Sequence, residues 1–289
     1  MAYDFDTVID RVPSSCLKWS YRKRFCGDDE VLPLWVADMD FAVAPEIQAA
    51  IEARAAHPVY GYPVRQDGFY ASLMGWTERR YGWEIKREWI CYSPGVVPAI
   101  NLAVLAYTQP GDKVVIQSPV YYPFGQAVLN NGRQLVDNPL RLTGDRYEMD
   151  LEDLERKIDS RTKLLILCSP HNPVGRVWTR GELEALVALC ARKGIVIVSD
   201  EIHADIVMPG HRHTSLASIS DEAAGMTVTC LATSKTFNLA GLCTANVVIP
   251  DKRLRDGFMT MGGSLGLATS NVFGIAAQEA AYTKGEPWL

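Results

Sequence analysis

One lysine stands among small hydroxyl side chains directly after a short apolar run. Lys235 lies between Ser234 and Thr236, and the run 227–231 precedes it. A buried, unpaired ammonium is very costly, so most lysines lie on solvated faces. At the exit of a strand, a partly desolvated lysine can lose its proton and attack a carbonyl carbon. The segment 233–242 therefore predicts a reactive lysine, while a loop lysine that covers a turn is the alternative for so short a motif.

Polar groups also follow two other apolar runs. Asn172 comes after the run 163–168, in a turn that two prolines and a glycine fix. Asp200 follows the run 195–199, and a carboxylate buried there needs a cationic or hydrogen-bonding partner. Taken singly, a tight turn explains the first pattern and a helix cap explains the second. Since the carboxyl ends of parallel strands meet at one edge, we expect both groups to share a pocket with Lys235.

Two further segments predict a phosphate site and a stacking ring. Gly95 and Val96 lie just before an apolar helix predicted over 98–107, where free N–H groups and the helix dipole suit a phosphate dianion. Tyr121 follows the apolar run 113–118 and would bring a ring to the same edge, although core packing is the usual role of such a ring.

A lysine, an acid, an amide, a ring and a phosphate cradle are together what pyridoxal 5′-phosphate (PLP) requires. The lysine would form an imine with the cofactor. The carboxylate would keep the pyridine nitrogen protonated, because a nearby opposite charge favours the charged form. The amide would donate to the phenolate oxygen, and the aromatic ring would stack on the pyridine. These residues therefore predict a PLP enzyme.

Such a site needs a sheet that presents its groups at one edge. Short runs rich in Val, Ile and Leu alternate with helical patterns, as in parallel strands covered on both faces. Pro45 opens a helix predicted over 45–56, Asp150 caps a later one, and Thr179 with Glu182 forms a capping box. The predicted fold class is therefore α/β, a three-layer, doubly wound and mainly parallel sheet. The predicted strands are 113–117, 163–168, 195–199, 228–231 and 246–249.

Composition argues against several classes of protein. The 289 residues carry a net charge of −5 and no basic run, so nucleic acid and membrane are not expected as partners. Seven cysteines without a C-x-x-C pair predict neither a disulfide framework nor a metal site, and they fit a reducing cytoplasm. The first ten residues lack a basic segment followed by an apolar stretch, so no signal peptide is expected.

Two rival motifs carry less weight. The segment 262–266 matches G-x-S-x-G, but no apolar strand precedes it and no Asp-then-His order follows, as a serine hydrolase would need. His211 and His213 could suggest a metal site, but a solvated loop explains them better. No glycine-rich nucleotide motif occurs, so nicotinamide and nucleotide cofactors find no support.

The order of these motifs resembles the fold-type I PLP enzymes of the class I/II aminotransferase superfamily. The segment 35–41, the tripeptide Tyr60-Gly61-Tyr62 and the pair Ile202-His203 narrow the resemblance to the MalY/PatB-like cystathionine β-lyase branch. The resemblance runs from about residue 4 to residue 289 and implies a role for each matching residue.

By this resemblance, Lys235 would be the Schiff-base lysine and the acid/base, and Asp200 would pair with the pyridinium. Tyr121 would stack on the ring, and Asn172 would contact the ring oxygen together with His203. Four further residues would bind the phosphate, the last of them in the site of a neighbouring subunit: Gly95, Val96, Ser234 and Tyr62. The resemblance thus implies a homodimer with shared sites.

The resemblance also implies two segments, an N-terminal arm over 1–44 and a PLP-binding domain over 45–289. Asp38 would border the substrate pocket. Relatives continue into a C-terminal small domain with the arginine that grips the substrate carboxylate, and we expect this chain to lack that domain. The chain also lacks the phosphate-binding arginine that many relatives carry after the equivalent of Gly241-Leu242.

The predicted activity is that of a PLP-dependent carbon–sulfur β-lyase of the cystathionine β-lyase type. It would cleave L-cystathionine or related cysteine S-conjugates to a thiol, pyruvate and ammonia. Two alternatives stay open at this point. One is a class I/II aminotransferase, which shares the early steps, and the other is a regulatory protein that keeps the cofactor fold.

Overall fold

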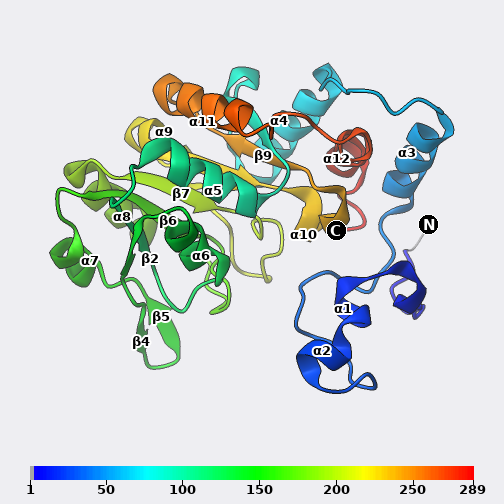
Figure 1. Ribbon diagram of the computed structural model, residues 1–289, viewed down its shortest axis with the longest axis horizontal. Coiled ribbons are helices and arrows are strands. Elements are labelled where there is room, and N and C mark those ends of the chain that lie inside the picture. Colours follow the sequence, from blue (N-terminus) through cyan, green and yellow to red (C-terminus); the bar gives the residue numbers. More distant parts are fainter. Residues whose placement is uncertain (1–2) are drawn as a thin grey trace.

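Apolar runs form the strands of one central sheet. Within residues 3–289, which the computed structural model describes, seven strands lie side by side (Figure 1). Their order across the sheet is β1 (Ile90–Ser93), β9 (Ala245–Val248), β8 (Thr227–Leu231), β7 (Val196–Asp200), β6 (Thr162–Cys168), β2 (Lys113–Ile116) and β3 (Gln134–Asp137). The strands β4 (Arg141–Thr143) and β5 (Arg146–Glu148) form a separate hairpin. The five predicted strands are all confirmed within one residue.

Strand directions confirm the predicted fold class with one correction. Neighbours from β3 to β8 are parallel, whereas β9 runs antiparallel to both β8 and β1. The expectation that 246–249 is a parallel strand is therefore wrong. The reason lies in the connection: residues 232–244 hold only one four-residue helix and a short 3₁₀ turn. A parallel return needs a crossover of a dozen or more residues, usually with a full helix across the sheet.

Helices cover both faces of the sheet, so the strands alternate between two buried sides. Val114 and Ile116 of β2 face one core and Val115 faces the other. The first face is covered by α5 (Val96–Tyr107), α6 (Pro123–Asn130) and α11 (Lys252–Ser264). The second face is covered by α7 (Leu151–Lys157), α8 (Arg180–Lys193) and α9 (Asp221–Met226), and near β8 and β9 by α3 (Pro45–Ala56), α4 (Asp67–Tyr81) and α12 (Val272–Lys284).

Local signals set the helix ends as predicted. The Asp150 side chain accepts a hydrogen bond from the Asp153 N–H at 2.9 Å and so caps α7. Thr179 and Glu182 form the reciprocal capping box that opens α8. The helix predicted over 98–107 begins two residues earlier, at Val96, because Gly95 already provides its N-cap.

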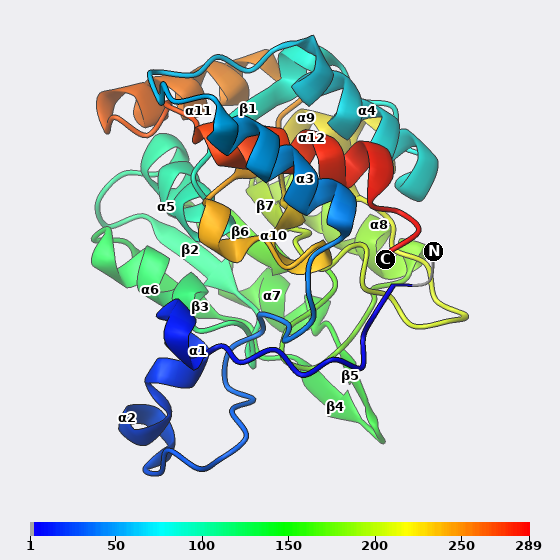
Figure 2. The same ribbon diagram turned by 90° about the vertical axis from the view of Figure 1, so that its right-hand side faces the viewer.

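The N-terminal segment is held more loosely than the body. It contains α1 (Leu17–Ser20) and α2 (Arg22–Cys26), which lie below α3 in both ribbon views (Figures 1 and 2). Leu32 and Leu34 are 71% and 82% exposed, so little of this segment is apolar core. The first two residues of the arm expected over 1–44 lie outside the described residues.

The structure also places the two rival motifs, the G-x-S-x-G segment 262–266 and the histidine pair at 211 and 213. Ser264 is the last residue of α11 and is exposed, so it does not sit on a turn after a strand. His211 is exposed, but the expectation that His213 is solvated is wrong: it is buried and its Nε2 lies 2.9 Å from Oε2 of Glu201. The contact with the buried Glu201 carboxylate holds the His213 ring inside the fold, and the spacing of the two residues in the sequence does not predict this contact. Over residues 3–289, no helix has the length and apolar character needed to cross a membrane.

Candidate active site

The strand register brings five chain segments to one edge of the sheet. Cys168 at the end of β6 pairs with Asp200 at the end of β7, and Asp200 pairs with Cys230 near the end of β8. Leu231 and Ser93, which end β8 and β1, lie opposite adjacent residues of β9. The segments that follow these strands and β2 therefore emerge side by side. They carry the predicted residues Asn172, Asp200, Lys235, Gly95 and Tyr121.

Lys235 lies on the short helix α10 (Thr233–Thr236), directly after β8. Burial lowers the pKa of its ammonium, and the negative charges of Asp38 and Asp200 act against that shift. A lysine with a lowered pKa keeps more of the neutral amine at a given pH, which is the form that attacks a carbonyl or accepts a proton. Lys235 is thus half-buried at the exit of β8, and its role as the reactive lysine stays a prediction.

Asp200 ends β7 inside the fold. Burial raises the pKa of its carboxyl to about 7, the neighbouring Glu201 adds to that rise, and the Ile202 N–H and Lys235 act against it. Among the described residues, the carboxylate accepts one hydrogen bond, from the Ile202 N–H at 3.1 Å. A buried carboxyl with this pKa is a strong site for a cation, because a nearby positive charge would restore its ionised form.

A buried acid that the sequence did not point out fixes the lysine turn. Asp205 accepts hydrogen bonds from the Thr236 hydroxyl at 2.8 Å, from the Tyr81 hydroxyl at 2.6 Å and from Trp76 Nε1 at 3.1 Å. Thr236 is the neighbour of Lys235, so Asp205 anchors the turn that presents the amine. Its donors on α4 lie more than 120 positions away along the chain, so the only local signal in the sequence was a second acid after Asp200.

Tyr121 and His203 lie close to this pair of charged groups. Tyr121 is half-buried, and its pKa is raised by burial, by Tyr122 and by the charge of Asp200. Burial, reinforced by the charge of Lys235, lowers the pKa of His203 to about 4, so the imidazole is neutral at pH 7. The structure thus brings both residues to the electrostatic surroundings of Asp200 and Lys235.

Asn172 and His203 line one cavity of about 660 Å³ at this edge. The backbone N–H of Asn172 donates to Cys168 Sγ at 3.3 Å, which holds the turn against the end of β6. The same cavity is also lined by apolar side chains and by two arginines: Ala37, Ile206, Val207, Met208, Arg146 and Arg176. This combination suits a small molecule with an apolar part and a few polar groups.

The predicted phosphate residues divide into two places. Gly95 precedes α5, whose first-turn N–H groups at Val96 and Val97 have no partner within the helix. Ser234 lies on α10 next to Lys235. Tyr62 is 96% exposed and lines a separate cavity of about 480 Å³ with Arg54 and Glu279. This chain therefore does not bring Tyr62 into the pocket around its own Lys235.

Comparisons with known proteins point to one family. Residues 29–282 match the family described as aminotransferase class I and II. The cystathionine β-lyase PatB of Bacillus subtilis is 45% identical over 287 residues, which is 99% of this chain and 74% of PatB.

Solved structures agree. A PLP-bound putative aminotransferase from Clostridium difficile superposes with a TM-score of 0.97 at 44% identity, over 99% of this chain and 74% of that one. Cystalysin from Treponema denticola, whose structure contains a PLP cofactor, superposes with a TM-score of 0.96 at 36% identity, over 100% of this chain and 74% of that one.

Proposed function

Because this chain belongs to the aminotransferase class I and II family, we propose that it binds PLP and acts as a carbon–sulfur β-lyase. Its substrate would be L-cystathionine or a related cysteine S-conjugate, and its products a thiol, pyruvate and ammonia. The name of the 45% identical relative, a cystathionine β-lyase, supports this choice of reaction. The cofactors in the two superposed structures support PLP as the cofactor.

The observation that carries the proposal is that Lys235 and Asp200 lie at the same edge of the sheet, partly and fully buried, and that the charge of each shifts the pKa of the other. Burial shifts both pKa values toward the neutral forms, and over residues 3–289 no cation forms an ion pair with the Asp200 carboxyl. A pyridinium nitrogen would supply that cation, and an aldehyde would find a nucleophilic amine. The donor set thus fits PLP on the properties of these residues alone.

We assign the other site residues by the same fit. Tyr121 would stack on the pyridine ring, and Asn172 and neutral His203 would contact the ring oxygen. The N–H groups at Gly95 and Val96 and the Ser234 hydroxyl would hold the phosphate. Tyr62, which is exposed and lines a separate cavity, would serve the phosphate of a partner chain in a homodimer.

The chemistry divides between the cofactor and the chain. When bound, PLP supplies an electron sink for the pair left at Cα when its proton is removed. Lys235 Nζ would take that proton, because Asp205 anchors its turn and burial favours the neutral amine. The Asp200 carboxylate keeps the ring nitrogen cationic throughout. The cavity beside Asn172 and His203 offers room for the sulfur substituent that leaves from Cβ.

We also propose the division of the chain into an arm over 1–44 and a cofactor domain over 45–289. Seven unpaired cysteines support a reducing, cytoplasmic location. These assignments follow the family and can each be tested apart from the reaction.

Product analysis tests the reaction most simply. We expect the purified chain, loaded with PLP, to release pyruvate from L-cystathionine without an added 2-oxo acid. An aminotransferase would instead need a 2-oxo acid and would return an amino acid. This second assay is included because one similar structure, at 44% identity, is described as a putative aminotransferase. PLP binding without either product would favour the regulatory role and contradict the proposed lyase.

A further inference from the structure

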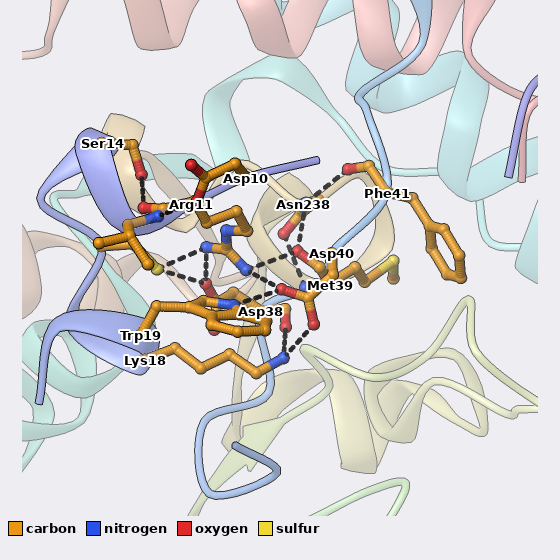
Figure 3. A network of polar contacts seen from close by, with 12 residues as sticks. Asp10, Arg11, Ser14, Lys18, Trp19, Asp38, Met39, Asp40, Phe41 and Asn238 are labelled. Atoms are coloured by element: carbon orange, nitrogen blue, oxygen red, sulfur yellow. Dashed lines mark hydrogen bonds and ion pairs between the residues drawn. The ribbon is translucent and has the colours of Figure 1, made fainter. Parts of the chain in front are cut away.

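A network of charges links the N-terminal arm to the lysine turn. In Figure 3, Arg11 lies between Asp38 and Asp40, and Lys18 reaches both Asp40 and the backbone of Asp38. Trp19 Nε1 donates to Asp40 at 2.8 Å. The family resemblance implies only that Asp38 borders the substrate pocket. Its contacts in this structure indicate a further role next to Lys235.

The two carboxylate oxygens of Asp38 have different surroundings. Oδ2 forms an ion pair with the Arg11 guanidinium and lies 3.8 Å from Cys16 Sγ. Oδ1 is buried, and over residues 3–289 it finds no hydrogen-bond donor. A buried acceptor without a partner costs free energy, so a donor that arrives during function would be bound readily.

Besides Arg11, the charge of Asp38 acts on Lys235. The Asp38 charge raises the pKa of that lysine and does so ahead of Asp200. The groups facing Lys235 are therefore Asp38 from the loop 36–41, Asp200 from β7 and His203 from the turn after β7. His203 is neutral at pH 7, which leaves the two carboxyl groups to set the charge around the amine.

One side chain fixes the loop of Asp38 to the turn of Lys235. Asn238, three residues after the lysine, accepts from the Met39 N–H at 2.9 Å and donates to the Met39 carbonyl at 3.0 Å. It also donates to the carbonyl of Phe41 at 3.2 Å (Figure 3). Asn238 has φ +58°, a left-handed conformation that asparagine adopts more readily than most residues. The two segments thus form one unit, although nearly 200 residues separate them.

We propose that Asp38 is a positioning residue whose free Oδ1 receives the ammonium of Lys235 once that lysine has taken up a proton. When the Cα–H bond breaks, its electron pair stays on carbon and the proton forms a new N–H bond on Nζ. The Asp38 carboxylate then becomes the partner of the resulting Lys235 ammonium, whereas Asp200 would pair with the ring nitrogen of the cofactor. Arg11 neutralises part of the Asp38 charge and so limits how strongly the proton is held. This inference rests on the proposed role of Lys235 as the base.

The test measures the proton affinity of Lys235 in the cofactor-free chain. Each variant is labelled with acetic anhydride over a pH series, and mass spectrometry gives the acylated fraction of the Lys235 peptide. Asp38→Asn removes the charge but keeps the shape, so we expect the apparent pKa of Lys235 to fall by about one unit, a roughly tenfold rise in neutral amine. Arg11→Gln exposes the full Asp38 charge and should raise the pKa instead.

Asp40→Asn is the matched control. It removes one charge from the same network, two residues away, but Asp40 is not among the charges that shift Lys235. We expect it to change the apparent pKa by less than a third of the Asp38→Asn shift. Circular dichroism checks that each variant folds, and the opposite sign expected for Arg11→Gln separates a charge effect from a general loosening.

An unchanged pKa in folded Asp38→Asn, or an equal shift in Asp40→Asn, would overturn the inference. If Asp38→Asn does not fold, a fall or no change in Arg11→Gln overturns it in the same way. Uptake of PLP by the parent chain is measured separately. Normal PLP uptake, with a Lys235 pKa that does not change in the variants, would reject only the role of Asp38. A Lys235 pKa that changes as expected, without PLP uptake by the parent chain, would reject only the proposed function.

Discussion

The strand-end site and the N-terminal arm are built in opposite ways. The site lies where β6, β7 and β8 end, so ladder hydrogen bonds and a buried core on both faces fix its residues. The arm holds its place through ion pairs among Arg11, Lys18, Asp38 and Asp40, with exposed leucines between them. These ion pairs are partly buried, with Asp40 the most exposed partner at 39%, and their strength depends on salt and pH, whereas apolar packing depends on neither to the same extent.

This difference separates two tasks. The rigid edge supplies the groups that must stay in place during the reaction, namely Lys235 and Asp200. The arm supplies the Asp38 carboxylate, which in our proposal receives the protonated Lys235 and which stands on a loop outside the sheet. We therefore expect changes at the edge to alter chemistry strongly and changes in the arm to alter proton affinity and local order modestly.

The largest effect is expected for Lys235→Ala. Loss of the nucleophile and the base should lower pyruvate release from L-cystathionine on the order of ten-thousandfold or more. Steady-state assays of PLP-loaded protein measure this directly. Lys252→Ala is the control, because Lys252 is a well-exposed lysine on α11 that pairs only with Asp256. Substantial turnover by Lys235→Ala would show that another lysine does the chemistry.

The next effect concerns the stability of the cofactor-free chain. The folded pKa of Asp200, about 7, lies above its unfolded value of 3.8, so the folded state binds the extra proton. Its free energy of unfolding should therefore fall as pH rises from about 4 to about 7. Asp200→Asn has no proton to lose and should be more stable than the parent at pH 8, by at most about 4 kcal/mol at 1.36 kcal/mol per pKa unit.

Urea unfolding of both cofactor-free proteins at pH 5 and pH 8 measures this change. Cys190→Ser, at a buried thiol of α8 away from the edge, serves as a control whose pH dependence should match the parent. A lower stability of Asp200→Asn at pH 8 would mean that the carboxylate already has a strong partner in the empty site. With PLP bound, the same substitution should abolish turnover, so the two readouts move in opposite directions.

The smallest effect belongs to the arm. Although burial opposes the shift, hydrogen bonds from Lys18, Trp19 and Arg11 lower the pKa of Asp40 to about 2. The stabilisation is present above about pH 4 and is lost as pH falls through 2. Because the Asp40 side chain is 39% exposed, we expect it to be worth less than about 1 kcal/mol.

Hydrogen exchange followed by mass spectrometry resolves that loss. Peptides from 11–41 should lose protection between pH 4 and pH 2, while peptides from β6 and β7 keep theirs. Asp40→Asn should show weaker protection than the parent at pH 4, and the difference should shrink as the pH falls to 2. Simultaneous loss in the arm and the sheet would mean that the two regions form one cooperative unit.

Sequence predicted the parts of this molecule that depend on local pattern. Apolar runs gave the strands, and the rule that strand ends meet at one edge brought Asn172, Asp200 and Lys235 together. The antiparallel direction of β9 was not predicted, because it follows from the absence of a full crossover helix in the connection 232–244. Side-chain contacts that depend on how the chain folds back were not predicted either: Asp205 with Trp76 and Asn238 with Met39, over 129 and 199 positions, and His213 with Glu201, over 12 positions of irregular chain. No short-range pattern signals such pairs.

Reduction with borohydride tests the central claim most directly. The purified chain is incubated with PLP, reduced, digested and mapped by mass spectrometry, with Lys235→Ala treated in parallel. We predict one cofactor mass per chain, fixed on the peptide that contains Lys235, and none fixed in the variant. Attachment to another lysine, or no attachment while the protein is folded, would contradict the assignment of this strand-end edge as a PLP site.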